Sequence, residues 1–82
     1  MQGKRLADGT DWSSDLLPGA YWKHAVGHWV GLTPNNLTCN LEKHSVVEHE
    51  DGTITVSPSI LVNGGNQYTW HGFLEKGVWR SC

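Results

Sequence analysis

Apolar and polar side chains alternate on both sides of Asp51-Gly52, and this is the strongest local pattern in the chain. The run from His44 to Val56 has the two-residue period of half-buried strands. Asp-Gly is typical of a two-residue type I′ turn, because both central residues of that turn need a positive φ. The pattern therefore predicts a β-hairpin that ends at Pro58, which has no N–H to donate to a neighbouring strand.

The same alternation predicts the register of this hairpin. With a two-residue turn, Val47 faces Val56 and His49 faces Ile54, so that one face is apolar apart from the histidine. A three-residue loop would place Glu48 beside Ile54 and mix the two faces. We therefore expect the two-residue turn, with His49 either bonded to a partner in the core or open to a pocket.

The rest of the chain consists of short runs of strand-forming residues between turns rich in Gly, Pro and Asn, which recur roughly every 8–12 positions. Strands are predicted at residues 21–24, 28–32, 37–41, 60–62, 67–74 and 78–80, and turns at residues 25–27, 33–36, 63–66 and 75–77. No segment has helical periodicity. The chain is therefore predicted to be all-β, a small single domain of about six short antiparallel strands arranged as a sheet, a sandwich or an open barrel.

The N-terminal part of the chain is polar and rich in Gly, Asp and Ser. This composition predicts a flexible N-terminal arm over residues 1–15 and a single β domain over residues 16–82. Two interpretations of the arm stay open: it frays in solution, or Trp12 docks it onto a neighbouring subunit. Because a small sheet leaves edges and aromatic side chains to cover, we expect a homo-oligomer.

Charge and hydropathy exclude several classes of partner. The chain has 82 residues, a formal net charge of −2 and a pI near 6.2, so it lacks the basic surface that duplex nucleic acid requires. No apolar run is long enough to span a bilayer, and no hydrophobic segment follows Met1–Arg5. We therefore expect a cytoplasmic protein without a membrane partner, with Cys39 and Cys82 reduced and no glycan at the acceptor-like Asn36-Leu37-Thr38.

Two segments carry a motif that resembles a known family. They read Glu48-His49-x-Asp51-Gly52-Thr53-x-Thr55-x-x-Pro58-Ser59-Ile60 and Trp70-His71-Gly72-Phe73-Leu74-x-x-Gly77-Val78-Trp79. This order is similar to that of a family of small phage and prophage proteins, some of which are labelled ammonia monooxygenase. The resemblance implies a viral protein of the host-cell cytoplasm and no defined activity. Ammonia monooxygenases are membrane-embedded metalloenzymes, so we do not expect that activity in a chain without a membrane span.

Many relatives in that family have a Cys-x-x-Cys-Gly-His element near the first strands, which implies half of a zinc site. The matching stretch here is Lys23-His24-Ala25-Val26-Gly27-His28, in which both cysteines are absent. The remaining ligand types, His71, Cys39 and Cys82, are far apart in sequence, whereas structural zinc sites use closely spaced pairs. We therefore expect no metal and no other cofactor.

The sequence also lacks the usual signs of catalysis. Glu48, His49 and Glu50 are adjacent, but successive residues of a strand point to opposite faces and cannot easily act together. The chain has no Gly-x-Ser-x-Gly element and no phosphate-binding loop. We therefore expect that the protein is not an enzyme.

The aromatic residues are the strongest indication of a binding function. Five Trp, two Tyr and one Phe are more than about six short strands need for packing, although core and interface positions are the ordinary places for them. Aromatic faces stack on nucleobases, and Arg and His donate hydrogen bonds to phosphate. The residues predicted to bind a ligand on this basis are His71, Trp70, Trp22, Trp29, Tyr68, Trp79, Arg80 and His49.

Taken together, these features predict a non-enzymatic phage accessory protein. It would sequester a small nucleotide-type host defence signal in an aromatic and His-lined pocket at a subunit interface. One alternative is a protein–protein inhibitor of a host factor, with the aromatic patch as the hot spot of the contact. Another is a degenerate structural domain that resembles a zinc ribbon.

Overall fold

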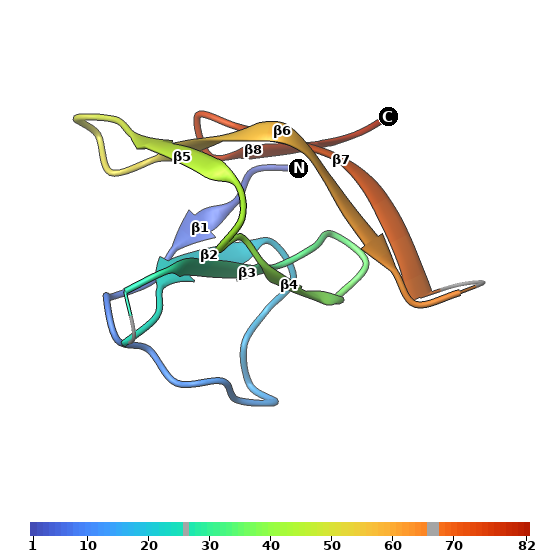
Figure 1. Ribbon diagram of the computed structural model, residues 1–82. Coiled ribbons are helices and arrows are strands. Elements are labelled where there is room, and N and C mark those ends of the chain that lie inside the picture. Colours follow the sequence, from blue (N-terminus) through green and yellow to red (C-terminus); the bar gives the residue numbers. More distant parts are fainter. Residues whose placement is uncertain (26, 66–67) are drawn as a thin grey trace.

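The computed structural model describes residues 1–25, 27–65 and 68–82, and these form eight strands in two four-stranded sheets (Figure 1). The first sheet has the order β1 (Lys4–Arg5), β2 (Ala20–Lys23), β3 (Trp29–Leu32) and β4 (Thr38–Asn40). The second has the order β5 (Ser45–Glu48), β6 (Ile54–Asn63), β7 (Thr69–Glu75) and β8 (Val78–Ser81). Every neighbouring pair is antiparallel except β1 and β2, which are parallel. The predicted all-β fold is confirmed.

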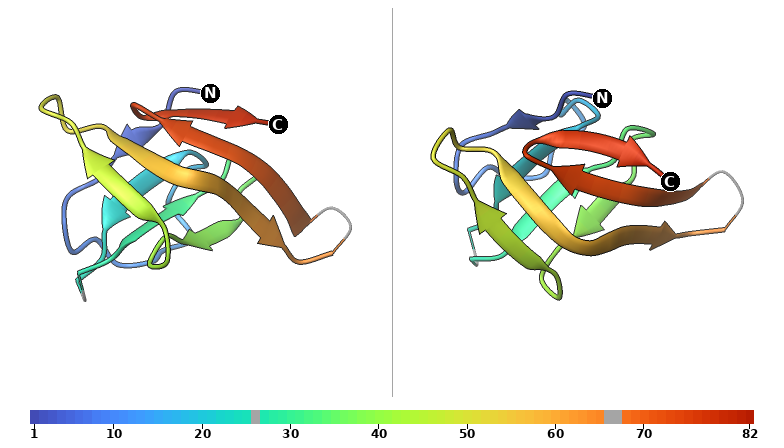
Figure 2. Two further views of the ribbon diagram at one scale, coloured as in Figure 1. Left: turned by 45° about the horizontal axis from the view of Figure 1, so that its top comes forward. Right: turned by 90° about the horizontal axis from the view of Figure 1, so that it is seen from above.

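The two sheets form two layers, and the main hydrophobic core lies between them (Figures 1 and 2). The core combines buried side chains from both halves of the chain: Tyr21, Trp29, Cys39, Leu41, Ile54, Val56, Ile60, Trp70, Leu74 and Trp79. Side chains of β7 alternate between the two faces, because Trp70 and Leu74 are buried while His71 and Phe73 are exposed. Across the layers, the indole N–H of Trp79 donates to the carbonyl of Gly19 at 2.8 Å.

The first sheet is covered on its other face as well. The segment between β1 and β2 runs over the side of this sheet that faces away from β5–β8 (Figure 1). There Leu6 and Leu16 pack against a second buried cluster of Ala20, Trp22 and Val30. This double covering explains why all four residues of β3 are buried.

The first residues of the chain connect the two sheets, in contrast to the flexible arm expected over residues 1–15. Lys4 and Arg5 pair in parallel with β2, and Gln2 forms a bridge with Val78 of β8. The Gly3 N–H donates to the Gly77 carbonyl at 2.7 Å. The expectation of an arm was drawn from polar composition, which does not reveal backbone pairing to strands distant in the sequence.

Trp12, the residue considered for docking onto a neighbour, packs within its own chain. Its ring meets that of Trp22 edge to face, with centroids 4.8 Å apart and an interplanar angle of 68°. Its side chain is nevertheless 42% exposed. Trp12 therefore fixes the segment between β1 and β2 onto the first sheet while still presenting an aromatic surface to solvent.

The β5–β6 hairpin has the three-residue loop that the sequence pattern disfavoured. Val46 faces Val56 and Glu48 faces Ile54, one residue out of the predicted register. The loop closes with the His49 N–H donating to the Thr53 carbonyl at 2.8 Å, and its last residue is Gly52, with a φ of 86°. A glycine at this position of a three-residue hairpin loop is favoured, because the residue adopts a left-handed conformation.

Two side-chain contacts that the apolar and polar pattern does not indicate stabilise this register. The Asp51 carboxylate accepts from the N–H and the hydroxyl of Thr53, at 3.0 and 2.6 Å, and these hydrogen bonds lower the pKa of Asp51. Glu48 lies on the inward face at the sheet edge, where its carboxylate meets the Arg5 guanidinium at 2.6 Å. A charge that the binary pattern assigned to solvent is thus accommodated by a partner more than 40 residues away.

We had expected Pro58 to end its strand, but the strand continues past it. β6 continues from Ile54 to Asn63, with a cis peptide bond between Ser57 and Pro58. The β6–β7 register shifts between Val56 and Ile60, so the missing N–H falls where ladder pairing is interrupted. Leu61 of the same strand is 59% exposed, while Ile60 is buried in the core.

A few sequence predictions lie partly outside the described residues. These are the turn at residues 25–27, the loop at residues 63–66 and the strand that begins at Gln67, because Val26, Asn66 and Gln67 are not described. In the parts of the chain that the structure describes, no helix is long and apolar enough to cross a membrane.

Gly72 of the family-like Trp-His-Gly-Phe-Leu segment occupies a position where no side chain fits. A Cβ atom there would collide with the carbonyl oxygen of Arg80 and lie 2.6 Å from the indole of Trp70. Because the first of these contacts is with backbone, we expect Gly72→Ala to lower the free energy of unfolding by about 3 kcal/mol, measured by urea denaturation. Phe73→Ala is the matched control at an exposed neighbour and should cost about 1 kcal/mol or less. Equal effects of the two substitutions would contradict this packing.

The two cysteines differ sharply in environment, which gives a direct test of the layered core. Burial raises the pKa of Cys39 to about 12, whereas Cys82 is exposed. A thiol-reactive aromatic disulfide at pH 8 should therefore label one thiol in the folded protein and both in urea, because the thiolate is the reacting species. Rapid labelling of both thiols without urea would show that Cys39 is not in the core.

Candidate functional site

A groove that combines charged and apolar side chains lies on the outer face of the second sheet. It has a volume of about 650 Å³ and is lined by Val47, His49, Thr55, Glu75, Lys76, Val78 and Arg80. These residues come from all four strands of the sheet and from the β5–β6 and β7–β8 turns. The β5–β6 and β7–β8 turns lie at the same end of the sheet, opposite the end at which β6 finishes and β7 begins (Figure 2).

The β7–β8 turn brings Lys76 to the groove in a defined conformation. Glu75 pairs with Val78, leaving a two-residue turn in which Lys76 and Gly77 have φ values of 47° and 77°. Positive φ at both positions is the property of a type I′ turn, so the turn type expected at Asp51-Gly52 occurs here. The Gly77 N–H donates to the Ile54 carbonyl at 3.0 Å, which holds the turn against β6.

Thr55 connects the two turns from the middle of the groove. Its hydroxyl oxygen accepts a hydrogen bond from the Lys76 N–H at 3.0 Å, and the same oxygen lies 2.7 Å from Nε2 of His49. The hydroxyl can serve both partners because it has two lone pairs and a proton. His49 is therefore held in orientation at the groove wall, which answers whether this histidine is a core residue or opens into a pocket.

The charges around the groove are predominantly positive. Lys76 and Arg80 carry the cations, His49 adds a third nitrogen donor or acceptor, and Glu75 carries the opposing charge. The Arg80 and Glu75 side chains are 3.7 Å apart and are 67% and 49% exposed. An exposed ion pair of this kind contributes little to stability, and Glu75 is readily replaced by another anion. Arg80 is therefore available to a ligand.

Four of the predicted ligand residues lie in the core instead. Trp22 and Trp79 are 0% and 1% exposed, and Trp70 and Trp29 are 8% and 9% exposed. Their burial places these four indoles among the packing residues of the two core clusters, where they offer little surface to a ligand. Trp70 and Trp79 pack edge to face against each other with centroids 5.5 Å apart, while Trp29 lies beneath the Arg5 guanidinium at 5.0 Å.

The remaining predicted residues divide between the groove and other parts of the surface. His49 and Arg80 lie together in the groove. His71 is exposed and hydrogen-bonded to Ser59 at 3.1 Å, but it points away from Trp70 because the two are adjacent in β7. Tyr68 is 55% exposed at the far end of the β6–β7 hairpin.

Sequence reasoning did not include Lys76, Thr55, Val47 and Val78 in the predicted ligand set. A signal was nevertheless present, because consecutive hairpins of an antiparallel meander return alternate turns to the same end of the sheet. The Glu75-Lys76-Gly77 turn and the Asp51-Gly52 turn are separated by one intervening hairpin. The two turns could therefore have been placed side by side before the structure was known.

The candidate zinc ligands are dispersed in the structure. Among residues 1–25, 27–65 and 68–82, no three His, Cys, Asp or Glu side chains lie close enough to hold a metal ion together. The His24 and His28 rings stack with centroids 5.6 Å apart. Cys39 is buried in the core and Cys82 is at an exposed position beyond β8.

Comparisons with protein-family models, curated proteins and solved structures found no match to this chain. The resemblance to the phage family therefore stays a prediction, and the function is argued from the geometry of the site.

The role of Thr55 in joining the two turns can be tested with a substitution of the same shape. Thr55→Val removes the hydroxyl, so the Lys76 N–H and the His49 ring lose their partner. We expect a loss of about 1 kcal/mol in the free energy of unfolding and faster amide exchange at Lys76. Thr69→Val, at an exposed β7 position, should change neither quantity by a comparable amount. Unchanged exchange at Lys76 would show that the hydroxyl does not hold the turn.

Proposed function

We propose that the protein is a non-enzymatic binding protein that holds a small anionic ligand in the groove between its two hairpin turns. The observation that carries the proposal is the convergence of Lys76, Arg80 and His49 on one hollow. The guanidinium of Arg80 offers a planar pair of donors that suits phosphate or carboxylate oxygens, and the Lys76 ammonium adds a point charge. The volume of about 650 Å³ lies within the usual range of ligand sites.

The apolar part of the groove supports a ligand that is more than a bare ion. Val47 and Val78 contribute apolar lining beside the charged groups. Phe73, which is 40% exposed, is the register partner of Arg80 on the neighbouring strand. A phosphate bound by Arg80 would therefore lie near an exposed aromatic face, and stacking on such a face is how a nucleobase is commonly held. This arrangement favours a nucleotide-type ligand, with Phe73 in the stacking role first assigned to the tryptophans.

The protein in this proposal sequesters its ligand and does not transform it. The Glu48 carboxylate is engaged by Arg5 on the inward face, whereas His49 lies in the groove on the outward face. These two groups therefore do not act as an acid–base pair. Cys39 is buried with a raised pKa, so it is a poor nucleophile. The role of a phage accessory protein in the host cytoplasm, acting on a nucleotide-type defence signal, belongs to the proposal and is motivated by the family-like motif.

A homo-oligomer also belongs to this proposal. The groove opens outward on the second sheet and is not enclosed by its own chain. A second copy placed over this face would exclude water from the cations and strengthen their interaction with an anion. Light scattering with and without ligand measures the oligomeric state directly.

A second candidate function rests on the exposed apolar side chains of the second sheet. Val47, Leu61 and Phe73 are 57%, 59% and 40% exposed and all lie on the second sheet. Exposed apolar residues rimmed by charges are typical of protein-binding surfaces. The inhibitor of a host protein would use this face, and it would show no response to nucleotides.

The ligand proposal is tested with inorganic pyrophosphate, AMP, ADP and adenosine as probes. We expect the phosphorylated probes to raise the Tm and to bind in calorimetry, whereas adenosine binds much more weakly because it has no charge for Arg80 and Lys76. Arg80→Gln should weaken binding about tenfold or more by removing the charge-assisted donors. Lys76→Asn should act in the same direction, since Asn tolerates the positive φ at this position.

Lys43→Gln is the matched control, because it removes an exposed lysine that is not among the groove residues. Its binding should equal that of the unchanged protein. The proposal fails if no phosphorylated probe binds, or if Arg80→Gln and Lys43→Gln have equal effects. Absence of probe binding together with a stable complex with one host protein would favour the inhibitor function instead.

A further inference from the structure

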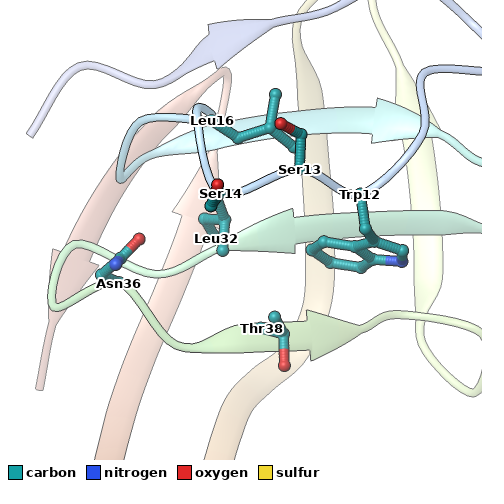
Figure 3. A pocket seen from close by; sticks show the side chains of 7 residues that line it. All are labelled: Trp12, Ser13, Ser14, Leu16, Leu32, Asn36 and Thr38. Carbon is teal, nitrogen blue, oxygen red and sulfur yellow. The ribbon is translucent and has the colours of Figure 1, made fainter.

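A separate hollow lies on the opposite side of the molecule, over β3 and β4 of the first sheet. It has a volume of about 430 Å³, within the usual range of ligand sites. The segment between β1 and β2 forms its upper wall, and β4 with the turn before it forms the lower one (Figure 3). The hollow shares no lining residue with the groove on the second sheet.

Trp12 forms one end of this hollow, and its aromatic surface is available to a ligand. All five tryptophans lie in the described ranges, and the other four are at most 9% exposed while Trp12 is 42% exposed. The edge-to-face contact with Trp22, at 4.8 Å, holds the Trp12 ring in place. A ring fixed in this way presents a surface without the entropy cost of ordering it on binding.

The base of the hollow is apolar and its rim is polar but uncharged. Leu32 lies in its middle, between Trp12 at one end and Asn36 at the other (Figure 3). Leu16 adds apolar surface, while Ser14 and Thr38 add hydroxyl groups on opposite sides. Among the described residues, the side chains of Ser14, Asn36 and Thr38 have no hydrogen-bond partner, so each can serve a ligand.

We infer that this hollow binds a neutral carbohydrate, with a pyranose ring packed between Trp12 and Leu32. A pyranose has apolar C–H groups on its faces and hydroxyl groups around its perimeter, which matches an apolar base with a polar rim. Hydroxyl and amide groups both donate and accept, as sugar hydroxyls do. No lining residue carries a charge, so the site does not suit the anion expected in the groove.

The inference is tested by saturation-transfer NMR and fluorescence titration with glucose, galactose, N-acetylglucosamine, maltose, lactose and chitobiose. At least one probe should bind saturably and change the fluorescence of the exposed Trp12. Trp12→Ala should weaken that binding about tenfold or more, because the stacking surface is removed. The affinity of this variant for the sugar is measured by NMR, because the variant lacks the Trp12 fluorescence that reports binding.

Two further variants keep the test decisive if Trp12→Ala disturbs folding. Asn36→Gly removes the amide and suits the φ of 65° at this position, and Thr38→Val removes a hydroxyl from an exposed strand position. Each should weaken binding about threefold to tenfold with little change in Tm. Val47→Ala, on the opposite face, should leave sugar binding unchanged.

Three results would overturn the inference: no sugar binds, sugar binding is unaffected by the three variants, or adenosine binds in the hollow in place of sugars. Arg80→Gln tests the groove separately, because it should weaken anion binding and leave sugar binding intact. Failure of one site is thereby distinguished from failure of the other.

Discussion

The two sheets of this protein depend on one short segment that belongs to neither half of the fold alone. Residues 1–6 bridge to β8 through Gln2 and Gly3 and pair with β2 through Lys4 and Arg5. The approach to β8 is so close that a Cβ on Gly3 would lie 2.7 Å from the Gly77 carbonyl. The Arg5 guanidinium extends the connection to the β5–β6 turn, donating to the Glu48 carboxylate and to the Gly52 carbonyl at 3.0 Å. Glu48 in turn raises the pKa of Arg5, so this cation stays charged at any physiological pH.

The residues that pack the two sheets together are distinct from the residues that line the surface hollows. Four indoles fill the layers, and one of them, Trp79, adds a buried hydrogen bond between the sheets. The inner layers are therefore committed to packing. The polar chemistry is carried by turns and outer faces, where loops positioned on a rigid scaffold usually bear function. The two hollows fall on opposite faces, one charged and one neutral, and each is built on a different sheet.

The sequence predicted local structure well wherever one face of a strand is buried and the other exposed. β7 is the clearest case, since its alternating pattern directly reflects burial. The predicted register of the β5–β6 hairpin was wrong, because the observed register depends on Arg5, a partner of Glu48 that no local pattern can reveal. The role of the tryptophans could not be read from composition, because the same residue type serves cores and ligand sites equally well. Part of the candidate groove was predicted, because His49 and Arg80 were among the expected ligand residues. Thr55 was not, since it connects His49 to the Lys76 turn through geometry that exists only after the sheet has formed.

The bridge between Gln2 and Val78 also has a consequence for how the protein is made. These residues are 76 positions apart, so the bridge between the two sheets can form only after Val78 has been synthesised and has emerged from the ribosome. Long-range pairings of this kind are slow to form, because the intervening chain must be ordered first. Until then the edge of β8 and the inner face of β2 have no partner, which is the state in which small β proteins aggregate most readily. The nascent chain therefore remains vulnerable to aggregation until β8 has emerged and Val78 can pair with Gln2.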